Sequence, residues 1–234
     1  RFDRCIVRSE AVPEAEWQAM APRGVWVHAA RVTAAAPWAQ WRADSSGVDL
    51  ADDLARGCRQ FAAMALEAVV IGHTSSSVIG GKGWDEAVIG EMRTILGDDV
   101  QVTTNGADTI AGLMAVGARR PYIVAPPWFG DGAIQSALTY YADYGFEPAG
   151  AMRYDPGGKW RDIPPEGLYA RGMGFAQRIK PLYQQITDTC PAEADAIFIA
   201  GTGFRCVGII EALEGALGRP VVTANQASLW RCLR

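Results

Sequence analysis

The sequence has little of what metal and redox sites are built from. It contains two histidines and five cysteines in 234 residues, and the cysteines are widely spaced, with no CxxC pair. This composition predicts no zinc site, no other bound metal and no disulfide framework, and it favours free thiols in a reducing compartment. An excess of positive charge is also absent: the net charge is −4, with Arg and Lys scattered along the chain. Binding to nucleic acid or to an anionic membrane surface is therefore not expected.

Long hydrophobic runs and nucleotide-binding glycine motifs are absent too. No apolar stretch approaches the roughly 18–20 residues of a membrane span, and the opening residues RFDRCIVRSE lack the apolar region of a signal peptide. The segments GGKG at 80–83 and AGTGFR at 200–205 match neither the GxGxxG of dinucleotide sites nor the GxxxxGK of a P-loop. We expect a cytoplasmic protein that needs no cofactor.

What the sequence does contain is a regular alternation of short apolar runs with longer amphipathic segments. That alternation predicts an α/β fold in which parallel sheets are covered by helices. Strands are expected within 24–32, 66–72, 99–104, 120–127, 195–201 and 219–225. Helices are expected within 50–66, 83–96, 106–117, 131–144, 167–188 and 206–217. Residues 154–167 are rich in Pro and Gly and predict a surface loop of the kind that covers a cleft.

The chain also contains an internal repeat. AVVIGHTSSS at 68–77 and LGDDVQVTTNGA at 96–107 are echoed by AIFIAGTGFR at 196–205 and LGRPVVTANQA at 217–227. The echo pairs His73 with Gly201, and Asn105 with Asn225. It predicts two Rossmann-like lobes related by a pseudo-twofold axis, 1–113 plus 220–234 and 114–219. Ligands of parallel sheets bind beyond the carboxyl ends of the strands, so the cleft between the lobes is the expected site.

The first of these loops, GHTSSS at 72–77, has two interpretations. In one, a hydroxyl caps the next helix and His73 fills space. In the other, backbone N–H groups and the hydroxyls of Thr74 and Ser75 cradle an anion, with His73 beside it as acid or base. The second loop offers the same donors through Thr202, Gly203 and Arg205. His28, in the middle of a predicted strand, is expected to be structural.

Six segments, taken in order, resemble the maleate cis-trans isomerase and arylmalonate decarboxylase branch of the aspartate/glutamate racemase superfamily. They are GVWVHAARV, IGHTSSSVIGG, VTTNGA, APPW, IAGTGFR and RPVVTANQASLWRCLR, and they span residues 24–234. The resemblance implies two Rossmann-like lobes, a cofactor-free active site between them and small carboxylates as substrates.

This chain departs from the pattern of that family at both catalytic positions. Typical members carry a cysteine at the start of each Thr loop, and decarboxylases keep only the second. Here His73 and Gly201 stand at those places. Proton transfer between paired thiols and thiolate addition to an alkene are then not expected, whereas an imidazole keeps acid/base chemistry. Cys206, five residues beyond Gly201, is expected to be a small packed residue.

Other positions bear on the substrate. Trp128 stands where the family has an aromatic residue, usually Tyr, so the pocket or its substrate should differ. In VRSEAVPE at 7–14, Ser9 is expected to keep a carboxylate-binding role, whereas Glu10 replaces an amide and would repel a second carboxylate. This argues against maleate as the substrate. The expected substrate-binding and oxyanion-binding residues are Ser9, Thr74, Ser75, Asn105, Trp128, Gly201, Thr202, Gly203 and Arg205.

The leading interpretation is a cofactor-independent isomerase or decarboxylase that acts on a small organic carboxylate through an enediolate-like intermediate. His73 would move the proton while the two Thr loops hold the oxyanion. Two alternatives stay open: a hydrolase or lyase with His73 as general base, and a carboxylate-binding protein that has lost catalysis. The expected partner is a small carboxylate, and a homo-oligomer remains an open possibility.

Overall fold

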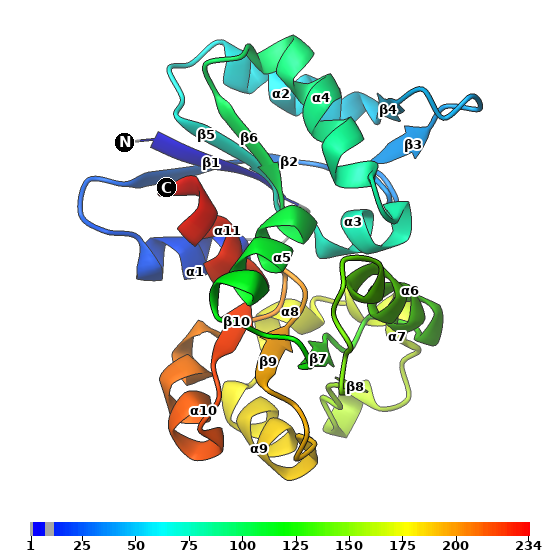
Figure 1. The fold of residues 1–234 in the computed structure, drawn as a ribbon, viewed down its shortest axis with the longest axis vertical. Helices are drawn as coiled ribbons and strands as arrows, with labels where there is room; N and C mark the ends of the chain where they lie inside the picture. The colour runs from blue at the N-terminus through cyan, green and yellow to red at the C-terminus, as the bar shows by residue number, and fades with distance from the viewer. Residues whose placement is uncertain (1, 8–11) are drawn as a thin grey trace.

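The computed structural model describes residues 2–7 and 12–234 and builds them into two α/β halves, each on a four-stranded parallel sheet (Figure 1). The first sheet has the order β2-β1-β5-β6 and consists of β1 (Phe2–Val7), β2 (Trp26–Arg31), β5 (Ala68–Ile71) and β6 (Gln101–Thr104). The second has the order β10-β9-β7-β8 and consists of β7 (Pro121–Ala125), β8 (Gly150–Arg153), β9 (Ala196–Ile199) and β10 (Val221–Thr223). A small antiparallel pair adds β3 (Ala39–Trp41) and β4 (Val48–Leu50). The predicted α/β class is confirmed.

The two sheets have the same strand order when each half is numbered from its own first strand. In both, the second strand of the half lies at one edge, followed by the first, third and fourth. Strands β5 and β9, which precede the two Thr loops, therefore hold equivalent places inside their sheets. All four residues of each of these strands are buried, as the continuous apolar runs predicted.

Most predicted helices form, but one is broken. The helices are α1 (Val12–Met20), α2 (Asp52–Ala62), α3 (Thr74–Gly80), α4 (Trp84–Leu96), α5 (Asn105–Ala115), α6 (Asp131–Asp143), α7 (Pro165–Leu168), α8 (Met173–Ala176), α9 (Ile179–Thr189), α10 (Ile210–Leu217) and α11 (Ala224–Cys232), with short 3₁₀ turns at Gly158–Trp160 and Val207–Ile209. The single helix predicted over 167–188 is wrong. Gly172 adopts φ 76°, which interrupts it, and Pro181 is tolerated because α9 begins only two residues earlier.

Helices α5 and α11 pack on each other and form a layer that both sheets share (Figure 1). Leu229 of α11 packs with Val70 of the first sheet. Leu113 of α5 packs with Phe198 of the second. Strand β10, which the sequence interpretation assigned to the first lobe, instead pairs with β9. Residues 220–234 thus do not return to the first sheet as one unit, because only α11 packs on it.

The described part of the chain has no helix that combines the length and the apolar character needed to cross a bilayer.

The carboxyl groups buried near this layer include Asp108 of α5, which is completely buried, and Asp85 of α4. The carboxyl oxygens of Asp108 accept hydrogen bonds from the hydroxyls of Thr103 and Ser228. These bonds do not offset the loss of hydration, and burial raises the pKa of Asp108 from 3.8 to about 8. Burial also raises the pKa of Asp85. Asp108 therefore folds with a proton that the unfolded chain loses in mildly acidic solution.

This proton makes stability depend on pH. The pKa of Asp108 is raised on folding, so its contribution to the free energy of unfolding is fully present below about pH 4 and is lost by about pH 8, at up to about 1.4 kcal/mol per pH unit. Asp108→Asn keeps the shape of the side chain and cannot ionise. We expect the variant to gain stability relative to the wild type as the pH rises through this window. Urea unfolding followed by circular dichroism measures the difference, and parallel pH profiles would contradict it. Asp162→Asn, which replaces an exposed carboxylate, is the control and should follow the pH profile of the wild type.

Candidate active site

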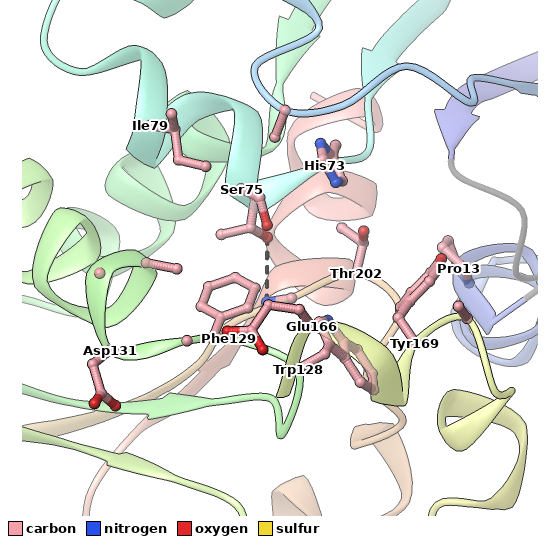
Figure 2. Close-up of a pocket in the computed structure, with 18 residues that line it drawn as sticks. Pro13, His73, Ser75, Ile79, Trp128, Phe129, Asp131, Glu166, Tyr169 and Thr202 are labelled. Carbon is pink, nitrogen blue, oxygen red and sulfur yellow. Dashed lines mark hydrogen bonds between the residues drawn. The ribbon is translucent and has the colours of Figure 1, made fainter. Parts of the chain in front are cut away.

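A cavity of about 520 Å³ lies at the carboxyl ends of β5, β7 and β9, between the two halves (Figure 2). Most of its wall is formed by the segments that follow these strands and by the segment around α7, and Pro13 of α1 and Ala36 complete it. The lining residues are Pro13, Ala36, His73, Thr74, Ser75, Ile79, Trp128, Phe129, Gly130, Asp131, Gly132, Ala133, Glu166, Tyr169, Ala170, Gly201, Thr202 and Gly203. The two Thr loops of the repeat thus meet at one cavity, as predicted.

The two Thr loops are tied to each other by reciprocal hydrogen bonds. The N–H of Gly201 donates to Thr74 Oγ1 at 3.2 Å, and Thr202 Oγ1 donates to the carbonyl oxygen of Gly72 at 2.7 Å. Thr74 Oγ1 donates in turn to Asn105 Oδ1 at 2.5 Å. Both hydroxyl protons are therefore held within the protein, whereas the sequence interpretation expected them to face an anion. The N–H of Ser76 donates to the carbonyl oxygen of His73 at 3.1 Å. The N–H groups of Thr74 and Ser75, at the start of α3, have no acceptor within the helix, and both residues line the cavity.

The two asparagines of the repeat hold these threonines from behind. Asn105 is fully buried and does not line the cavity. Its Nδ2 donates to Ser228 Oγ at 2.9 Å, which turns its Oδ1 toward Thr74. Asn225 Nδ2 donates to the carbonyl oxygen of Thr202 at 3.0 Å. Asn105, predicted to bind substrate, is a positioning residue in this geometry.

His73 lies at the end of β5 with its ring packed flat against Trp38. The ring centroids are 4.0 Å apart and the planes differ by 4°. The imidazole Nδ1 lies 2.8 Å from Ser76 Oγ, and Ser76 Oγ accepts the backbone N–H of Trp38 at 3.0 Å. These contacts fix the plane and rotation of the imidazole at the cavity wall. No sequence signal pointed to Trp38, which lies 35 residues away along the chain.

The other face of the cavity is aromatic and acidic. Trp128 packs edge to face with Tyr169, with the ring centroids 5.3 Å apart and the planes at 78°. Asp131 and Glu166 bring two carboxylates to the wall. Sequence reasoning identified Trp128 and missed the other three. The only signal was the loop expected over 154–167 to cover a cleft, and Glu166 of that segment lines the cavity.

Gly201 stands where the resemblance places a second cysteine, and its backbone suits glycine. It adopts φ 92°, in the left-handed region that L side chains rarely occupy. A Cβ at this position would lie 2.9 Å from Pro126 Cγ, closer than real contacts allow. The second loop therefore has no side chain at this point, and the cavity is asymmetric: an imidazole on one side and open backbone on the other.

Three residues named from sequence lie elsewhere or outside the described chain. Arg205 is exposed and lines a different cavity, and its backbone N–H and carbonyl are bonded to the side chain of Gln177 at 2.7 and 2.6 Å. The expectation that Arg205 faces the substrate is therefore not met. Ser9 and Glu10 lie outside the described residues.

Cys206 is a packed residue, as expected. Its side chain is buried, and its backbone N–H donates to Glu16 Oε1 at 2.6 Å. Burial, followed by the neighbouring Glu16 carboxylate, raises the pKa of the Cys206 thiol well above its usual range. A thiol with such a pKa is a poor nucleophile at neutral pH. None of the described residues that line the cavity is a cysteine.

Comparison with known proteins gives matches among solved structures. No family model and no curated protein matches the chain. Unliganded arylmalonate decarboxylase aligns with a TM-score of 0.73 at 19% identity, over 100% of this chain and 91% of the other. The maleate isomerase Iso of Pseudomonas putida S16 aligns at 0.76 and 16% identity over the same shares. This chain has the fold of arylmalonate decarboxylase and maleate isomerase. The resemblance in the motifs is thus confirmed at the level of the fold.

A third solved structure marks a difference within this shared fold. It is a variant of the Nocardia farcinica maleate cis-trans isomerase with a covalently bound succinylcysteine intermediate, aligned at a TM-score of 0.79 and 16% identity over 100% of this chain and 91% of that one. In the present chain, the described wall of the cavity offers an imidazole and hydroxyls in place of a thiol. The fold is shared with that isomerase, whereas none of the described residues that line this cavity is a cysteine.

The bonds between the Thr loops can be tested by removing one hydroxyl. Thr202→Val keeps the side-chain shape but leaves the buried carbonyl of Gly72 without its 2.7 Å donor. We expect a loss of about 1–3 kcal/mol in the free energy of unfolding, the usual cost of an unsatisfied buried acceptor. Thr202→Ser keeps the donor and should lose less. Urea denaturation compares the three proteins, and equal stability of the valine variant and the wild type would show that the bond contributes nothing.

Proposed function

We propose that the protein is a cofactor-independent isomerase or decarboxylase of a small organic acid, with His73 as its acid/base group. The observation that carries the proposal is the meeting of an oriented imidazole and the two Thr loops at one cavity. The fold shared with arylmalonate decarboxylase and maleate isomerase supports the same reaction class.

The substrate carboxylate binds against the backbone N–H groups of Thr74 and Ser75 and the hydroxyl of Ser75, which lie at the cavity wall. When a bond at the neighbouring carbon breaks, its electron pair moves into the carboxylate and forms an enediolate with negative charge on oxygen. Donors that are already in place stabilise this charge, and a single well-placed donor contributes roughly 3–4 kcal/mol. The reciprocal Thr74 and Thr202 bonds hold those donors at a fixed separation.

His73 supplies the proton transfer. In an isomerisation it removes the proton from the carbon beside the carboxylate and returns it after the geometry has changed. In a decarboxylation the substrate carries a second carboxylate on the same carbon. The bond to this second group breaks, carbon dioxide leaves, the electron pair moves into the retained carboxylate, and the protonated imidazole delivers its proton to the carbon that lost the carboxylate. Because Gly201 provides no side chain, each route uses one acid/base group rather than a pair on opposite faces.

Exchange of carbon-bound hydrogen tests this role. A panel of small organic acids is incubated with wild-type protein in deuterated buffer. We expect deuterium to enter at the carbon beside the carboxylate of the acid that is the substrate, and NMR measures the rate of this exchange. His73→Asn should reduce the exchange rate by roughly 10²–10⁴-fold while leaving carboxylate binding largely intact, because the backbone donors remain. His28→Asn, which changes the exposed histidine on β2, is the matched control.

A thiol reagent should have little effect on this exchange. If the His73→Asn variant exchanges deuterium at the wild-type rate, His73 is not the acid/base group. Retained carboxylate binding without exchange on any acid of the panel would favour a binding protein over an enzyme.

A further inference from the structure

The cavity wall carries an unusual charge for a site that would take an organic acid. Its described lining residues include neither Lys nor Arg, but they include the carboxylates of Asp131 and Glu166. Asp131 is largely exposed and pairs with Arg153 Nη1 at 2.8 Å. Glu166 has no ion pair among the described residues. Its negative charge therefore has no counter-charge at the cavity.

Glu166 is an exposed residue whose carboxylate lies at the cavity wall beside the backbone of Gly130. Its Oε1 lies 2.9 Å from the point that a Cβ on residue 130 would occupy, so Gly130 makes room for this carboxylate. Figure 2 shows Glu166 close to Phe129 and Trp128, on the side of the cavity away from His73. A ligand carboxylate held by the Thr loops would direct its far end toward this side.

The surroundings of Glu166 match the chemistry of an ammonium group. Trp128 and Tyr169 line the same side of the cavity, and aromatic rings attract a nearby cation through their negative faces. The carboxylate of Glu166, an exposed residue on the same wall, adds direct charge pairing with such a cation. A second carboxylate on the ligand would instead meet like charge, with no lining cation to offset it.

On the basis of the proposed function, we propose that the substrate is a zwitterion: a small organic acid whose far end carries an ammonium or alkylammonium group. The carboxylate lies at the Thr loops, and Glu166 is the specificity-determining residue for the far end. This excludes linear dicarboxylates as good ligands of this site.

Matched pairs of probes test the proposal by calorimetric titration. β-Alanine, γ-aminobutyrate and δ-aminovalerate each differ from succinate, glutarate and adipate, respectively, in having an ammonium in place of the second carboxylate. We expect the zwitterion of the best-fitting length to bind wild-type protein at least about tenfold more tightly than its dicarboxylate partner. Glu166→Gln should remove most of that preference, and Glu166→Lys should reverse it. Asp162→Asn, an exposed carboxylate on the same segment that does not line the cavity, should leave it unchanged.

The outcomes separate this inference from the function on which it rests. If dicarboxylates bind as tightly as zwitterions, or if Glu166→Lys keeps the wild-type preference while its circular dichroism spectrum is unchanged, the inference is overturned and the carboxylate site stands. If neither series binds at millimolar concentration, the carboxylate site itself is wrong, and the inference fails with it.

Discussion

The candidate site depends above all on the two hydrogen bonds that the Thr loops make with each other. Thr74 accepts the N–H of Gly201, and Thr202 donates to the carbonyl of Gly72, so each loop provides a partner for the backbone of the other. These groups are buried, where breaking a bond leaves a polar atom without water. The loops therefore have little freedom to separate, and the two halves present one cavity instead of two strand ends.

Because of these bonds, the polar groups of the two Thr loops have different roles, although the loops are similar in sequence. The threonine hydroxyls, the N–H of Gly201 and the side chain of Asn105 all form hydrogen bonds that hold the loops together. The layer of α5 and α11 supports the arrangement because it packs on both sheets and carries Ser228, which orients Asn105. Rigidity of the donors is what electrostatic stabilisation of an enediolate requires.

The two sides of the cavity carry different chemical groups. On one side His73 is fixed between Trp38 and Ser76, and Gly201 across from it offers only backbone. On the other side Glu166, which has no ion pair among the described residues, lines the wall together with Trp128 and Tyr169. Solved proteins of the same fold include an isomerase with a covalently bound succinylcysteine intermediate, whereas none of the described lining residues of this cavity is a cysteine. Function on this fold has to be argued from the side chains in the cavity.

The sequence by itself determined the features that depend on near neighbours. Apolar runs predicted β5, β6, β7 and β9 correctly, because a buried strand leaves a local apolar pattern in the sequence. The repeat predicted correctly that the two Thr loops meet, because equivalent loops follow equivalent strands of two similar units. Only the tertiary structure decided that β10 joins the second sheet, that Trp38 packs on His73 and that Glu166 enters the cavity. These contacts join residues tens of positions apart, and their free energy depends on shape and burial, which no local pattern records.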